Sequence, residues 1–252
     1  MQNRLFALAA LLPCGLTAAP AAADISARYE FEQGGGSFNM AMTLEIDGNG
    51  NERVQMANQP GYMLILNDVI YMVNRGPTGV YVTRMDDFVT VFGEMSKRMG
   101  FDKAVAAMPE SATEKPPVIA PMGQKVVNGR TGTAYGISVD GKGPVYALIV
   151  ISDDPKLAPL GAAFVKSFAQ SAGMANKMLP GLGSMGGYFG PDAALLKKGA
   201  PLSLVMMNLS DISFAEIDDG RFTLPSQPLS IEQIRQQFES FPAPPTLPVR
   251  AN

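Results

Sequence analysis

The chain has 252 residues, of which 46% are hydrophobic and 17% are charged, and its formal net charge is −3. This composition supplies enough apolar side chains for a core and excludes wholesale disorder, while the mild acidity argues against nucleic-acid binding, which requires a basic face. The chain contains no histidine, which excludes Ser-His-Asp catalysis, histidine general bases and imidazole metal ligands.

Residues 1–23 have the features of a cleavable secretory signal. Arg4 provides a positive start, Leu5–Leu12 an apolar stretch, and Ala21–Ala23 a small-x-small cleavage pattern. The apolar stretch is shorter than the roughly 20 residues that span a bilayer, and no later run resembles a membrane helix. We therefore expect cleavage before Asp24 and a mature protein that is periplasmic and soluble, with no transmembrane segment.

The single cysteine, Cys14, lies within this signal. Lipidation at Cys14 is an alternative outcome, but Pro13 precedes it where lipidation sites have a small residue. Signal cleavage would leave the mature chain without a cysteine, and hence without disulfides, thiol catalysis or cysteine metal sites.

Residues 25–84 show the alternation and turn chemistry of an antiparallel meander. Phe38–Ile46 alternates apolar and polar residues, and Asp47–Asn51 and Asn67-Asp68 have residues that favour turns. Short turns can join only antiparallel strands. The expected strands are Ile25–Phe31, Phe38–Ile46, Arg53–Ala57, Tyr62–Leu66, Val69–Val73 and Val80–Arg84.

Beyond residue 84, helical spacing alternates with strands. An amphipathic helix is predicted over Phe88–Met99, with Asp86 or Asp87 as its cap, and a second apolar stripe runs from Phe164 to Leu179. Ser230 and Gln233 form a capping box before a C-terminal helix, which a proline-rich tail follows.

The same region contains loops and further strands. Pro109–Pro121 holds four prolines and Gly181–Gly190 is rich in glycine, so both are predicted loops. The further expected strands are Gln124–Val127, Thr133–Val139, Val145–Ile151, Leu202–Leu209, Ile212–Ile217 and Arg221–Leu224.

This order of elements resembles the periplasmic lipoprotein-carrier superfamily, the LolA-like half-barrels, over roughly residues 25–228. The resemblance implies one curved antiparallel sheet that helices partly plug, and it suggests a lipid-binding role. It rests on Val69–Val73, Gly79–Thr83 before a helix, Gly123–Val139, Val145–Asp154 and Phe222–Pro225.

The predicted fold class is therefore mainly β with helices (α+β): a single curved antiparallel sheet, a half-barrel, with helices on its concave face. The predicted organisation is a signal peptide at 1–23, a half-barrel domain at 24–228, and a C-terminal helix with a proline-rich tail at 229–252.

We expect no catalytic residues, no metal and no cofactor. The acidic pairs Asp86-Asp87, Asp153-Asp154 and Asp218-Asp219 occur at helix starts or turns, where aspartate forms local hydrogen bonds. Gly181–Gly186 matches a dinucleotide-binding pattern but follows a predicted helix instead of a strand. The turn at Asp47 lacks the glycine and glutamate of a calcium loop.

Methionine is the unusual residue, with 16 copies. Methionine suits core packing, adaptable apolar ligand surfaces or Cu(I) binding. We predict an apolar lining for a lipid or acyl-chain ligand, with the helix residues closing over the strand residues. The lining consists of Phe38, Met40, Met42 and Leu44 on one strand, Met56 on the next, and Phe92, Met95 and Met99 on the helix.

Three predicted strands are apolar on both faces, whereas a half-solvated sheet alternates. They are Met63–Leu66, Ala147–Ile151 and Leu204–Met207. Helices can cover one face, and either a ligand, a partner or the chain's own loops must cover the other. The leading hypothesis is a lipid-binding module, and the alternative is an interaction module that docks with an envelope protein partner without a small ligand.

Overall fold

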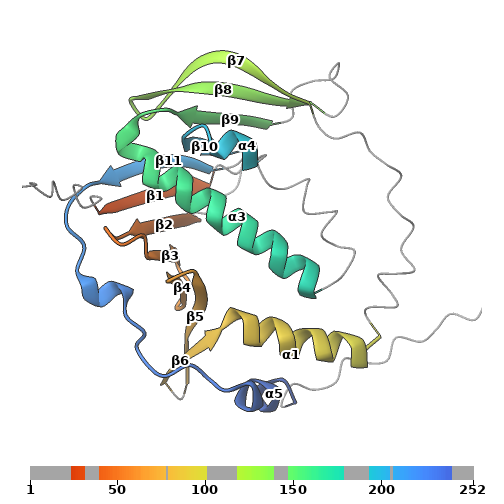
Figure 1. The fold of residues 1–252 in the computed structure, drawn as a ribbon. Coiled ribbons are helices and arrows are strands. Elements are labelled where there is room, and N and C mark those ends of the chain that lie inside the picture. Colours follow the sequence, from red (N-terminus) through yellow and green to blue (C-terminus); the bar gives the residue numbers. More distant parts are fainter. Residues whose placement is uncertain are drawn as a thin grey trace, which may run out of the picture.

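The computed structural model describes residues 24–31, 40–77, 79–100, 118–138, 147–178, 193–204 and 207–239. Eleven antiparallel strands form one curved sheet that does not close, in the order β6-β5-β4-β3-β2-β1-β11-β10-β9-β8-β7 (Figure 1). The strands curve around helix α3 (Ala158–Met178), which lies on the concave side. The predicted fold class is thus confirmed, while the predicted signal sequence lies outside the described residues.

The first six strands form the predicted meander. They are β1 (Ile25–Phe31), β2 (Ala41–Ile46), β3 (Glu52–Met56), β4 (Tyr62–Leu66), β5 (Val69–Gly76) and β6 (Gly79–Arg84). The turn at Asp47 forms as its residues predict, because the Asp47 carboxylate accepts hydrogen bonds from the backbone N–H groups of Asn49 and Asn51, each at 2.8 Å. Phe38, which we expected in the second strand, lies outside the described residues.

The other five strands differ more from prediction. They are β7 (Val118–Val127), β8 (Arg130–Ser138), β9 (Ala147–Ser152), β10 (Ala200–Leu204) and β11 (Met207–Ser213). The predicted loop up to Pro121 is wrong at its end, since β7 already begins at Val118. Pro121 is tolerated because β7 is an edge strand with a bulge between Pro121 and Gly123.

The predicted strand Leu202–Leu209 is also wrong. Ser203 pairs with Asn208 and Leu204 with Met207, so β10 and β11 are two arms of a hairpin. The predicted strand Ile212–Ile217 is likewise wrong, because β11 ends at Ser213. Pairing of β11 with β1, such as Leu209 opposite Tyr29, joins the two halves of the sheet.

The helices are α1 (Met85–Arg98), α3 (Ala158–Met178), α4 (Ala193–Leu196) and α5 (Ile231–Glu239), with short 3-10 turns η1 (Pro155–Leu157) and η3 (Asp219–Phe222). The predicted capping box is confirmed: Ser230 Oγ accepts from the Gln233 N–H at 3.2 Å, and Gln233 Oε1 accepts from the Ser230 N–H at 2.8 Å. The predicted cap of α1 is wrong, because its N-cap is Arg84 and no side chain caps it. None of the described helices is long and apolar enough to cross a bilayer.

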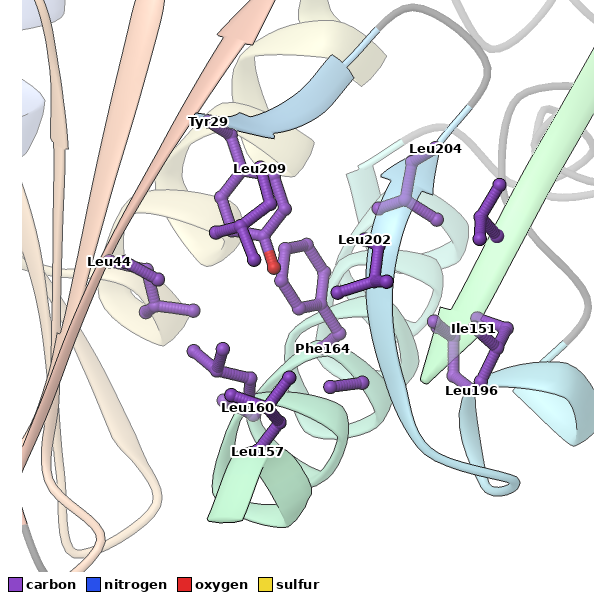
Figure 2. Packing of buried hydrophobic residues seen from close by; sticks show 14 of the residues in the cluster. Tyr29, Leu44, Ile151, Leu157, Leu160, Phe164, Leu196, Leu202, Leu204 and Leu209 are labelled. Carbon is purple, nitrogen blue, oxygen red and sulfur yellow. The ribbon is translucent and has the colours of Figure 1, made fainter. Parts of the chain in front are cut away.

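The main core lies where the start of α3 meets β1, β11, β10 and β9 (Figure 2). Leu160 is fully buried and Phe164 nearly so, and the Phe164 ring meets Tyr29 edge-on, with centroids 5.3 Å apart. The Tyr29 hydroxyl donates to the Pro201 carbonyl at 2.8 Å, and burial raises the pKa of this phenol. A densely packed core, in which the buried Tyr29 hydroxyl has a hydrogen-bond partner, therefore fills this half of the concavity.

The convex side of β4–β6 is covered by residues 214–230, which we call the C-terminal strap (Figure 1). Leu224 packs against a cluster of Leu64, Val73 and Val82, and the Leu229 N–H donates to the Val82 carbonyl at 2.8 Å. The chain itself thus covers the second apolar face of Met63–Leu66. The strand predicted at Arg221–Leu224 is wrong, because Asp219–Phe222 forms a 3-10 turn.

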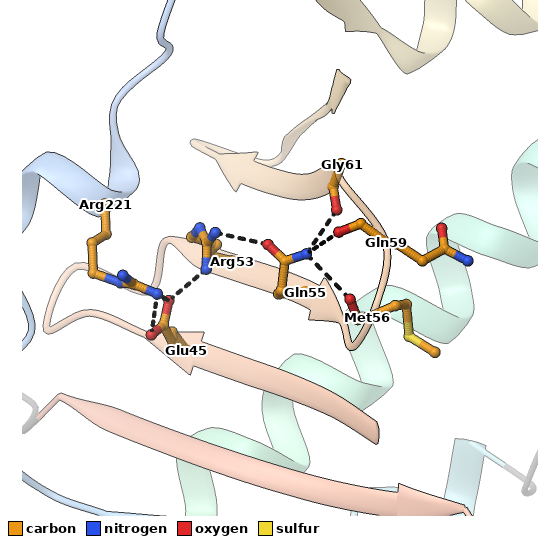
Figure 3. Close-up of polar contacts among 7 residues, drawn as sticks. All are labelled: Glu45, Arg53, Gln55, Met56, Gln59, Gly61 and Arg221. Atoms are coloured by element: carbon orange, nitrogen blue, oxygen red, sulfur yellow. Dashed lines mark hydrogen bonds and ion pairs between the residues drawn. The ribbon is translucent and has the colours of Figure 1, made fainter. Parts of the chain in front are cut away.

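Charged groups fasten this strap to the sheet (Figure 3). Glu45 is buried and accepts hydrogen bonds from Arg221 at 2.8 and 3.0 Å and from Arg53 at 3.1 Å. Near the start of the chain, the Asp24 carboxylate accepts from the Ile217 N–H at 2.7 Å. The strap therefore has both apolar and ionic anchors.

Candidate ligand-binding face

Four methionines from four neighbouring strands lie on one face of the sheet. Met42 of β2 pairs with Met56 of β3, and Met63 of β4 pairs with Met72 of β5. Val54, two residues from Met56 and on the same face, lies opposite Met63 and completes the row. All four methionines are half-buried. We call Met42, Met56, Met63 and Met72 the methionine face.

This face is the concave one. Met42 lies opposite Tyr29 in β1, and Tyr29 contacts Phe164 of α3. On β3, Glu52 lies two residues from Val54 and therefore on the same face, and its carboxylate contacts α3. The methionine face is thus on the helix side of the sheet.

Polar contacts hold the middle of α3 to this part of the sheet. Lys166 Nζ lies 2.8 Å from the Asp68 carboxylate and 3.5 Å from that of Glu52, while Ser167 Oγ lies 3.4 Å from Glu52. Further along the helix, Lys177 Nζ lies 3.4 Å from Asp86 at the start of α1. Ion pairs therefore replace the apolar packing found at the beginning of the helix.

Burial dominates the electrostatics of Glu52. Its loss of hydration raises the pKa of the carboxyl, and the nearby Lys166 ammonium offsets this only in part. Burial by itself would lower the pKa of Lys166, but its contacts with Asp68 and Glu52 raise that pKa overall. Lys166 thus stays cationic and is shared between two carboxylates.

Two hollows adjoin α3. One, of about 520 Å³, lies beside the beginning of the helix and α4, with small α3 residues such as Gly161 and Ala162 and with Lys197 and Lys198 in its lining. The other, of about 190 Å³, lies between α1, α3 and β5. The seven predicted lining residues that the structure describes, all but Phe38, belong to neither hollow.

Three of the strand residues of the predicted site are placed together. Met42, Leu44 and Met56 share the concave face, with Leu44 inside the main core. Met40 immediately precedes β2 and is half-buried.

The helix residues of the predicted site are arranged differently from our expectation. Phe92 stacks on Phe88, with ring centroids 6.1 Å apart, and meets Phe238 of α5 at 6.4 Å. We expected Phe92 and Met95 to be buried, but both are half-buried, and Met99 is 40% exposed. The reason is that α1 buries Val89 and Val91 instead, while Phe92 contacts α5.

Met63 and Met72 are absent from the predicted site. Met63–Leu66 is apolar at every position, so its periodicity does not distinguish the concave from the convex face. The pairing of β4 with β3 distinguishes the two faces, because Met63 lies opposite Val54, which is on the concave face.

Two of the predicted acidic pairs have a member with a local structural role. Asp154 accepts from the Lys156 N–H at 3.0 Å and begins η1, and Asp218 accepts from the Gly220 N–H at 2.8 Å and begins η3. Within the described ranges, no three or more histidine, cysteine, aspartate or glutamate residues gather in a way that could hold a metal ion.

Comparisons with known proteins found no match: no family model, no curated protein and no solved structure is similar to this chain at a significant level. The resemblance to LolA-like half-barrels therefore stays a prediction from the sequence. Function must be inferred from the geometry of the chain itself.

Proposed function

We propose that this protein is an exported, non-catalytic envelope protein that binds a lipid or acyl chain in the concavity of its half-barrel, as the LolA-like resemblance implies. The observation that supports this proposal best is the methionine face, in which Met42, Met56, Met63 and Met72 line up across four strands and stay half-buried.

Two physical features favour a ligand there. Thioether side chains are flexible and polarisable, so they adapt to apolar ligands of varied shape, and ligand sites are mostly apolar concave surfaces. The main core also ends before this region, since its cluster includes neither Met56, Met63 nor Met72, and only Met42 packs against its edge. The concave face thus offers apolar surface that the chain's own core leaves partly uncovered.

Methionine oxidation provides a direct test. A bound acyl chain should shield the methionine face, so oxidation of Met56, Met63 and Met72 should fall several-fold when a long-chain monoacylglycerol is added. Met122 on β7 is 57% exposed and is the internal control, whose oxidation should not change. Peptide mass spectrometry after brief peroxide treatment measures each site, and uniform oxidation with and without ligand would contradict the proposal.

One observation favours the alternative, an interaction module. The edge strand β7 is exposed at nearly every position, including Val118, Met122 and Val126, and an exposed edge can pair with a strand of another protein. The edge strand on the opposite side of the sheet, β6, is partly covered, since Pro228 of the strap forms a β-bridge with Val82. Co-purification of an envelope protein that Val126→Lys and Met122→Lys abolish, without bound lipid, would favour this alternative.

A further inference from the structure

The methionines of this chain are distributed unusually. Methionine is among the residue types that proteins most often bury completely, yet none of the methionines in the described ranges is buried. The buried apolar residues there are alanine, isoleucine, leucine, valine, phenylalanine and tyrosine. Every described methionine is half-buried or exposed instead. The chain thus keeps its thioether side chains out of the core that holds the fold together.

The contrast is clear on the concave face itself. Where the beginning of α3 covers the sheet, strand positions such as Tyr29, Leu204 and Leu209 are almost fully buried in the main core. Over β2–β5, the same face has the half-buried methionine face. Thioethers are oxidised readily, whereas aliphatic side chains are not. An oxidisable row therefore coincides with the surface that we assign to the ligand.

Few other side chains compete for an oxidant. The chain has no histidine and no tryptophan, and its single cysteine, Cys14, lies within the predicted signal. Methionine is thus the main target for a hydroperoxide in the predicted mature chain. Oxidation of this protein is therefore chiefly oxidation of methionine.

Oxidation would change the chemistry of the methionine face. Met42 is directly opposite Met56, and Met63 is directly opposite Met72, so the Cβ atoms of each pair are about 5 Å apart. A sulfoxide is polar and accepts hydrogen bonds, and an acyl chain offers it no donor. An acceptor that is covered without a donor is costly. Sulfoxides on this face therefore oppose an apolar ligand.

We infer that the methionine face is a redox switch: a hydroperoxide converts its thioethers to sulfoxides, and the oxidised face releases the lipid while the fold stays intact. In each step a sulfur lone pair attacks the peroxide, the O–O bond breaks and an S–O bond forms. The sulfur loses two electrons, and the peroxide leaves as water after hydrogen peroxide or as an alcohol after an organic hydroperoxide. This inference rests on the proposed function and adds a regulatory modification to the same site.

The first test compares ligand binding with stability before and after brief treatment with hydrogen peroxide. Equilibrium dialysis with a long-chain monoacylglycerol should show binding at least about tenfold weaker after oxidation. The thermal midpoint should fall by no more than about 4 °C, because the described core contains no methionine. Methionine sulfoxide reductases with a dithiol as reductant should restore binding.

Two sets of leucine substitutions, which nearly conserve volume, locate the effect. Met42→Leu, Met56→Leu, Met63→Leu and Met72→Leu together should give a protein whose binding no longer responds to peroxide. The matched control replaces four methionines outside this face and should still lose affinity on oxidation. Its changes are Met85→Leu, Met122→Leu, Met178→Leu and Met207→Leu.

A measurement on the wild type makes the test independent of how the variants fold. After partial oxidation, protein that no longer binds immobilised monoacylglycerol should be enriched in sulfoxides of the methionine face, but not in the sulfoxide of the exposed Met122, by peptide mass spectrometry.

Several results would overturn the switch and leave the proposed function standing: a face that stays unoxidised while Met122 is oxidised, an oxidised face that still binds, or equal loss of binding in both leucine variants. A large fall in the thermal midpoint would also do so, because binding would then be lost through unfolding. Absence of binding to the untreated protein would overturn the proposed function and the switch together.

Discussion

The two halves of the curved sheet use the same helix in different ways. Over β1, β11, β10 and β9, η1 and the beginning of α3 bury Leu157, Leu160 and Phe164 in the main core. Over β2–β5, the middle of α3 meets the sheet through Lys166, Ser167 and Gln170. One end of the helix is a structural anchor, while the other covers a half-buried apolar face through polar contacts.

The difference in energy between the two ends follows from the kinds of contact. Burying a large apolar side chain contributes about 1.5–3 kcal/mol, whereas an ion pair that solvent reaches contributes at most about 1 kcal/mol. Asp68 and Lys177 are largely exposed, at 84% and 65% of the side chain. The attachment of α3 above the methionine face is therefore the weaker one, and the proposed entry of a ligand there would require this.

The largest expected effect contrasts one apolar side chain from each end of α3. Phe164→Ala should lower the free energy of unfolding by about 3–5 kcal/mol, because it empties space in the dense core. Met174→Ala, at the half-buried end, should cost only about 1 kcal/mol. Urea unfolding of both variants measures the two free energies of unfolding. Equal losses of stability would contradict the difference between the two halves.

An intermediate effect is expected on the convex side of the weaker half. Arg221→Ala should cost about 1–2 kcal/mol, because Glu45 is buried and would keep Arg53 as its remaining charged partner. Amide hydrogen exchange should rise within the strap and stay unchanged in the main core. Arg28→Ala, which removes an exposed pair with Glu30, is the matched control and should have almost no effect. Unchanged exchange in the strap would show that its other contacts, such as Leu224 on the sheet and the Asp24–Ile217 hydrogen bond, are sufficient to hold it.

The smallest effect concerns Glu52, the buried carboxyl in the polar half. Its pKa in the folded chain is raised, so the folded state holds the proton more tightly than the unfolded chain. Stability linked to this group is fully present below its ordinary pKa and is lost as pH rises through the raised pKa.

Glu52→Gln cannot ionise and should remove this dependence. Its free energy of unfolding relative to wild type should rise with pH across that window, by less than about 1 kcal/mol since Lys166 partly compensates the ionised carboxylate. Thermal unfolding at a series of pH values measures the difference. A relative stability that falls as pH rises would mean that the ion pair outweighs the cost of burial.

Much of the fold could be read from local sequence. Tyr62–Leu66 is a strand with the predicted bounds, and Ser230 with Gln233 caps α5 as predicted. Alternation, turn residues and capping boxes involve residues only a few positions apart. They can therefore be recognised without knowledge of the tertiary contacts. The shared face of Met42, Leu44 and Met56 followed from the same local alternation.

Other features depended on contacts between distant residues. The full length of β7 comes from its pairing with β8, and the contact of Phe92 with Phe238 exists because α5 returns to α1. Met63 and Met72 could not be predicted as site residues, because a strand that is apolar at every position shows no preferred face in its sequence. Only the register of its pairing with the neighbouring strand shows which side chains lie on the concave face. The sequence alone therefore determined the strands of the first meander and the cap of α5, which rest on short-range interactions. The tertiary structure decided which apolar side chains form the core, which face the strap, and which remain on the methionine face.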